Sequence, residues 1–165
     1  MRIILRRPPS GAAFVHPLDP APRTAVLTAG FQKTKLTRVF PQGWNERAAR
    51  FSPACVAGPL DQLLQVAQAG WRVEHSIVVF TYAGQREFSA QDRESFWITF
   101  EVPVFEQYLG PDNELLASEC DAHSGLHIVN GYEDLDLEHE VCACGNRAPR
   151  LPRGPRIDEL TALLS

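Results

Sequence analysis

The sequence predicts an α/β protein built on a small mixed or parallel sheet, with a β-rich lobe at its C-terminal end. Two observations carry this prediction. Between residues 76 and 106, an apolar run, a helical segment and a second apolar run follow one another, which is a βαβ unit. After residue 119, cysteines and histidines alternate with short segments of strand character. The 165 residues, 44% of them hydrophobic, are enough for one domain with its own core.

We expect a single domain over residues 1–165, made of an α/β core (1–110), a zinc-binding lobe (111–150) and a C-terminal helix (151–165). In the core, short β-branched runs predict strands at 1–7, 24–28 and 36–40. The proline-rich residues 8–22 predict an irregular segment, and residues 43–53 fit no element clearly. Cys55 stands apart from the other cysteines and is expected to be a small buried apolar residue.

A helix is predicted over Leu60–Ala69. Pro59 suits its first turn, and Gly70 ends it. Its apolar residues recur at helical spacing and form one stripe. The next segment, Ser76–Thr81, is a continuous apolar run, which is typical of a strand buried on both faces of a parallel sheet.

The second helix of the βαβ region is predicted from Ala90 to about Phe100. Ser89 and Asp92 resemble a capping box, with Asp in place of the usual Glu. Val102–Glu106 is the following strand, and Pro103 places it at a strand start or an edge. Strand–helix–strand connections of this length are right-handed and bring the strands together in parallel. Val78 and Phe80 are therefore expected in the core, with the helix packed across them.

A ligand site is expected at the carboxyl end of the first of these strands. Open α/β sheets bind ligands in the crevice at the carboxyl ends of their strands. The loop at 83–85 follows the strand directly, so any small-molecule site should lie near Tyr82, Gln85 and Tyr108.

Five potential metal ligands lie within twenty-five residues: Cys120, His123, His127, Cys142 and Cys144. Thiolate and imidazole are the ligands that zinc prefers, and four of them close a structural site. Two thiolates at 142 and 144 can reach one ion through a turn that Gly145 relieves. His123 and His127 compete for the fourth place, and the spacing from Cys120 slightly favours His123. The other interpretation is a redox cysteine pair with two surface histidines.

The number of protein ligands decides what such a metal does. Four protein ligands leave no open position, whereas three leave room for a water and for Lewis-acid chemistry. Glu119, next to Cys120, is either an acid/base group or a partner that orients a ligand. The carboxylates between the ligand pairs form either a solvated hairpin face or a second metal site; they are Glu133, Asp134, Asp136, Glu138 and Glu140.

Bulk properties exclude two classes of partner. A net charge of −4 argues against binding to nucleic acid, which requires a basic excess. No apolar run approaches the roughly 20 residues of a membrane span. The N-terminus is too short for the apolar core of a signal peptide, so we expect a cytoplasmic protein. In that reducing compartment, paired cysteines are more often metal ligands than disulfides.

Four motifs follow one another between residues 77 and 150: Ile-Val-Val-Phe-Thr-Tyr-Ala-Gly from 77, Phe-Glu-Val-Pro-Val-Phe-Glu-Gln-Tyr from 100, Glu-Cys from 119 with Gly-Leu-His-Ile from 125, and Cys-Ala-Cys-Gly-Asn-Arg from 142. In this order they resemble the phenylacetate-CoA ligase and coenzyme F390 synthetase branch of the adenylate-forming enzymes. The last motif is similar to the Cys-x-Cys-Gly-Arg close of the zinc-bearing members. The resemblance covers under half of the chain and favours His127 as the fourth ligand.

The chain also departs from that family. Its members carry a Gly- and Ser/Thr-rich loop whose backbone N–H groups cradle ATP phosphates, and here Thr28–Lys33 has one glycine. The family's Tyr-Gly-x-x-Glu is broken after Tyr108, and the lobe with the catalytic lysine is absent from this sequence. Autonomous adenylation is therefore not expected.

These observations predict a zinc-binding, non-catalytic or accessory relative of the acyl-adenylating enzymes. It would bind a partner protein or a small acyl or nucleotide ligand. Two alternatives remain. One is a small zinc-dependent enzyme with an open coordination position, and the other is a ligase subunit completed by a separate chain that supplies the phosphate loop.

Overall fold

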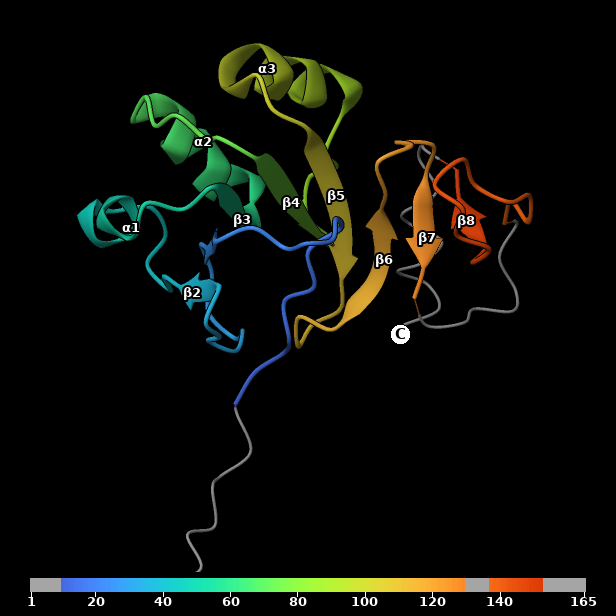
Figure 1. The fold of residues 1–165 in the computed structure, drawn as a ribbon, viewed down its shortest axis with the longest axis horizontal. Coiled ribbons are helices and arrows are strands. Elements are labelled where there is room, and N and C mark those ends of the chain that lie inside the picture. Colours follow the sequence, from blue (N-terminus) through green and yellow to red (C-terminus); the bar gives the residue numbers. More distant parts are fainter. Residues whose placement is uncertain (1–9, 130–136, 153–165) are drawn as a thin grey trace, which may run out of the picture.

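The computed structural model describes residues 10–129 and 137–152. Within them, eight strands form one mixed sheet, accompanied by three helices (Figure 1). The predicted α/β class is thereby confirmed, and of the two expected kinds of sheet, mixed or parallel, the structure has the mixed one. In chain order the elements are β1 (Thr24–Val26), β2 (Thr37–Val39), α1 (Glu46–Phe51), β3 (Cys55–Pro59), α2 (Leu60–Gln68), β4 (Ser76–Tyr82), α3 (Ala90–Phe100), β5 (Val104–Leu109), β6 (Leu115–Glu119), β7 (Leu126–Ile128) and β8 (Arg150–Leu151).

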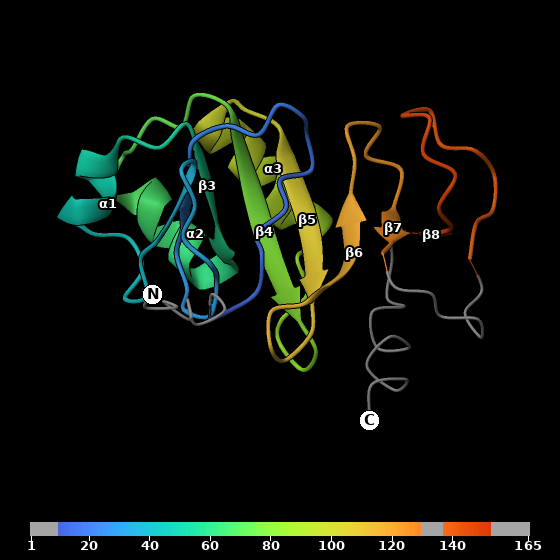
Figure 2. The same cartoon turned by 60° about the horizontal axis from the view of Figure 1, so that its bottom comes forward.

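The first five strands form the parallel half of the sheet, in the order β2-β1-β3-β4-β5. The predicted βαβ unit is confirmed, because β4 pairs in parallel with β5 and α3 connects them. The helices cover one face of the sheet, as Figure 2 shows. Phe96 and Phe100 of α3 and Leu63 of α2 pack there against Ile77 and Val79 of β4.

The opposite face is covered by the N-terminal segment rather than by a helix. Val78 and Phe80 point to this face, where they pack with Phe105 and with Phe14 and Phe31 from the N-terminal third. The expectation that the 89–100 helix packs across Val78 and Phe80 is thus wrong, because the helix lies on the opposite face of the sheet. Successive side chains of a strand point to opposite faces, so the helix contacts the residues that alternate with these two.

Local sequence explains where the helices begin. The Ser89–Asp92 capping box is present: the Asp92 N–H donates to Ser89 Oγ (3.1 Å), and the Ser89 N–H donates to Asp92 Oδ2 (2.9 Å). Pro59 precedes α2 as expected. In the segment 43–53, for which no element was predicted, Asn45 caps the short α1 by accepting from the N–H groups of Arg47 and Ala48.

Cys55 is fully buried as predicted, but the strand β3, which begins at Cys55, was not predicted.

The last three strands continue the same sheet in antiparallel fashion. Strands β6 and β7 lie in the β-rich lobe expected at 111–150, and before β8 Glu138 forms an isolated bridge with Arg150. The expected strand 1–7 and residues 153–165 of the expected C-terminal helix lie outside the described residues, and Leu151 belongs to β8 instead. This extension has its own small core of Tyr108, Leu116, Ala117, Leu126, Ile128 and Leu151.

Candidate metal centre

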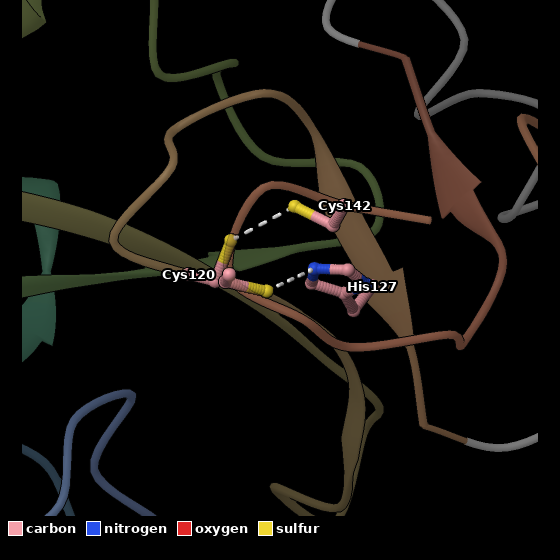
Figure 3. Close-up of side chains that lie close together, drawn as sticks. Cys120, His127 and Cys142 are labelled. Atoms are coloured by element: carbon pink, nitrogen blue, oxygen red, sulfur yellow. Dashed lines mark hydrogen bonds between the residues drawn. The ribbon is translucent and has the colours of Figure 1, made fainter. Parts of the chain in front are cut away.

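Three cysteines and one histidine converge at one end of the antiparallel strands. Cys120 directly follows β6, His127 lies in β7, and Cys142 and Cys144 lie in the loop before β8. Each offers one ligand atom, and the four atoms lie within 4.8 Å of one another. Figure 3 shows the side chains of Cys120, His127 and Cys142 pointing toward a common centre. This Cys3His group could therefore hold a metal ion.

Two of the separations within the group are close to those of a tetrahedral zinc site. Cys120 Sγ lies 3.6 Å from Cys142 Sγ, and Cys144 Sγ lies 3.5 Å from His127 Nε2. With Zn–S of about 2.3 Å and Zn–N of about 2.0–2.1 Å, a tetrahedral site has S–S separations of about 3.8 Å and S–N separations of about 3.6 Å. The donor set and its size therefore fit zinc.

A tight turn brings the two thiols of the Cys-x-Cys motif to the same side. The Gly145 N–H donates to the Cys142 carbonyl (2.8 Å), and Gly145 adopts φ 85°, which favours glycine. The Asn146 N–H points at Cys144 Sγ (3.4 Å). Backbone N–H groups aimed at sulfur stabilise the thiolate form that a metal requires.

The imidazole of His127 is oriented for ligation by its second nitrogen. Nδ1–H donates to the carbonyl of Ala148 (3.2 Å), which leaves the lone pair of Nε2 facing Cys144. Metal-binding histidines characteristically donate their other N–H in this way, which fixes both tautomer and ring orientation. The side chain is buried.

The thiols of the group differ in acidity. Burial raises the pKa of Cys120 to about 12. The pKa of Cys142 is lowered to about 6, first by a hydrogen bond from the Cys144 backbone and then by one from the Ser124 hydroxyl. A coordinated dication deprotonates thiols outright, so Cys120, with its raised pKa, is the ligand whose ionisation depends most on the metal.

The structure leaves His123 outside this group. Its Nδ1–H donates to Glu119 Oε1 (2.9 Å), and its ring stacks on Phe105 at 5.0 Å with an interplanar angle of 20°. Glu119 is 2% exposed and also accepts from Arg93 Nη2 (3.0 Å) and from the Glu106 N–H (2.9 Å). Glu119 therefore ties α3, β5 and the loop after β6 to one another.

The three residues expected around a small molecule do not lie together in the structure. Tyr82 and Gln85 lie at the carboxyl end of β4, where Gln85 is exposed. Tyr108 is completely buried in the core of the antiparallel strands. The Tyr82 hydroxyl donates to Asn113 Oδ1 (2.7 Å), and burial raises its pKa to about 12. Asn113, which the sequence analysis missed, lines a cavity of about 630 Å³ together with Gly30.

The acidic run lies partly in the described region. Glu138 and Glu140 are exposed, and Glu138 forms an ion pair with Arg150 (3.4 Å). Glu133, Asp134 and Asp136 lie outside the described residues. Glu138 and Glu140 therefore face solvent, as expected for the solvated face rather than for a second metal site.

Comparisons with known protein families, with curated proteins and with solved structures give no match. Among residues 10–129 and 137–152, no helix combines the length and the apolar character that crossing a membrane requires. The fold and the site define the class as an α/β protein with a Cys3His candidate metal centre. The similarity to ligases stays a prediction from sequence.

Proposed function

We propose that the chain is a zinc-binding protein whose metal has a structural role, with Cys120, His127, Cys142 and Cys144 as ligands. The observation that carries the proposal is the convergence of four soft donor atoms within 4.8 Å. Three thiolates and one imidazole complete a tetrahedron, and closed sites of this kind stabilise folds. The free thiols also suit a reducing compartment, the cytoplasm.

The part of the fold next to the site needs such support. Strand β8 has two residues and β7 has three. A small core of this kind supplies little stabilisation, and small β-rich units commonly rely on metals or disulfides. Zinc would bind the loop at 142–144 to the ends of β6 and β7, and would thereby hold β8 in the sheet.

Metal analysis of the purified chain tests the proposal. We expect about one zinc per chain, and His127→Ala should lower this content because it removes a ligand. His123→Ala is the matched control and should leave the zinc content unchanged, since His123 is bound to Glu119 instead. Equal loss of zinc in both variants, or a well-folded chain without metal, would contradict the proposal.

X-ray absorption at the zinc edge discriminates the rival interpretation, a small zinc-dependent enzyme. Cys144 is only partly buried, so a water could replace it as the fourth ligand. Three sulfurs and one nitrogen in the first shell support a structural role. Two sulfurs with an oxygen would favour the enzyme.

We further propose that the chain is a non-catalytic or accessory relative of the acyl-adenylating enzymes, which binds a partner protein or a small acyl or nucleotide ligand. The order of the four motifs between residues 77 and 150 supports the relationship. The structure of residues 28–33, which stand where the ligases have their ATP phosphate loop, supports the lack of adenylation activity. Phe31 stacks on Phe80 (5.1 Å), and the Gln32 N–H donates to the Ala12 carbonyl. This segment thus covers the sheet, and the cavity near Tyr82 is the proposed place for the ligand.

A pyrophosphate assay tests this second proposal. The zinc-loaded chain should not release pyrophosphate from ATP with aryl or fatty acids, because the phosphates would lack preorganised donors. Acid-dependent release by the pure chain would overturn the accessory role. Release that appears only when a co-purifying chain is added would instead support the alternative of a ligase subunit.

A further inference from the structure

A second cavity lies between α3 and the strands β5–β8, apart from the Cys3His group. Its volume is about 480 Å³, and its apolar wall includes Phe88, Trp97, Leu126, Leu151 and Pro152. Small-molecule sites are typically concave, mostly apolar and of this size, with a few polar groups that orient the ligand. We call it the α3 cavity.

Carboxylates dominate the polar part of the α3 cavity. Glu106 and Glu119 are 6% and 2% exposed, and both line the wall. Glu87 and Glu94 are exposed lining residues. Among the described lining residues Arg93 is the single cation; its guanidinium already donates to Glu119 (3.0 Å) and to the Val104 carbonyl (2.8 Å), and it forms an ion pair with Glu106 (3.8 Å).

This charge distribution favours a ligand with a positive charge. Among the described lining residues, four carboxylates outnumber one guanidinium, so this part of the cavity has a negative field, which low-dielectric apolar walls strengthen. An acyl carboxylate or a phosphate would be repelled, whereas a cation would be attracted. The α3 cavity is therefore unsuited to the acyl or nucleotide ligand proposed for the Tyr82 end of the sheet.

Two aromatic side chains make the same wall suitable for an organic cation. Trp97 is a lining residue whose surface is 57% exposed, an unusual position for a large aromatic side chain. Phe88, also in the lining, already holds the Arg93 guanidinium over its ring at 5.0 Å. Aromatic faces attract ammonium groups through their quadrupoles, and Trp does so most strongly.

We propose that the α3 cavity binds a small organic ammonium compound, a protonated amine carried on an aryl or alkyl body. The ammonium group lies among the carboxylates beside Trp97, and the apolar body packs against Leu126 and Leu151. This inference does not depend on the accessory role or on the identity of the metal, because no proposed zinc ligand lines the cavity.

Calorimetric and NMR titrations of the full zinc-loaded chain test the proposal with three probes of similar shape: phenethylamine, phenylethanol and phenylacetate. Phenethylamine should bind saturably and shift the indole N–H signal of Trp97. Phenylethanol should bind about tenfold more weakly, because it lacks the charge-assisted contact. Phenylacetate should show no saturable binding.

Variants at exposed positions keep the test free of folding defects. Glu94→Gln should weaken phenethylamine binding about threefold, as expected for one partly solvated charge. Glu101→Gln is the control at the C-cap of the same helix, since Glu101 is exposed and does not line the cavity. Trp97→Ala should also weaken phenethylamine binding about threefold, because it removes the aromatic face. The proposal is overturned if phenylacetate binds as well as the amine, if saturable amine binding is absent, or if Glu94→Gln and Glu101→Gln act alike.

Discussion

Replacing Cys142 by serine is expected to remove the zinc and to unfold the strands around it. Cys142 is 3% exposed, and its sulfur lies 3.6 Å from that of Cys120 at the centre of the group. Structural zinc can supply on the order of 10 kcal/mol to the fold that it binds, so the loss should be the largest of any single substitution in this chain. A serine hydroxyl keeps the size of the side chain but is a poor zinc ligand.

Metal content and thermal unfolding measure this effect. The control is Cys55→Ala, because Cys55 is a buried thiol of β3 that belongs to a different cluster of core residues. It should retain the zinc and lose only the stability of a small core truncation. Full zinc content in Cys142→Ser would contradict the prediction. So would a Cys120–Cys142 disulfide in a stable chain that lacks metal, since these sulfurs are neighbours already.

The sequence pointed to the right part of the chain for the site but left the fourth ligand open. Residue types and spacing placed cysteines and histidines around one ion, yet both histidines follow Cys120 closely. Strand register separates them: Ser118 of β6 pairs with His127 of β7, which fixes the imidazole beside the Cys-x-Cys loop. His123 lies in the connecting turn at φ 50° and contacts Glu119. The register of two short strands depends on their apolar pattern and on the turn between them, and the spacing of the ligands along the chain does not reveal it.

The fold was predictable where local signals were strong. The continuous apolar run of β4 and the capping box of α3 each encode their element, and together they predicted the parallel pair with β5. Strand β3 was missed because its five residues include alanine, glycine and proline, which strands disfavour. Tertiary packing overrides this composition: Gly58 lies so close to Leu27 that an added Cβ would come within 3.1 Å of its side chain.

The faces of the sheet were the least predictable feature. A strand buried on both sides gives no alternation of polar and apolar residues, so the sequence does not say which residues face the helices. The proline-rich N-terminal segment supplied the second cover, with Phe14 reaching the centre of the sheet. The apolar residues of this segment follow neither helical nor strand periodicity, so the sequence gives no sign of that role.

Truncating Phe80 to alanine is expected to cost about 3–5 kcal/mol of unfolding free energy, as large core truncations do. Phe80 is 1% exposed in the middle of the parallel sheet. Its ring stacks on Phe31 at 5.1 Å with an interplanar angle of 25° and contacts Phe14 at 6.0 Å. The substitution removes one of the residues that join the N-terminal cover to the sheet, and the irregular cover has little means of closing the cavity.

Chemical denaturation measures this loss, with Ile98→Ala as the control. Ile98 is apolar and of similar bulk but is 69% exposed on α3, so its truncation should change stability by less than about 0.5 kcal/mol. The folded fraction of Phe80→Ala should keep its zinc, because Phe80 and the Cys3His group belong to separate parts of the sheet. A loss no larger than that of Ile98→Ala would show that the N-terminal segment does not pack on β4, and the second face of the core would have to be assigned anew.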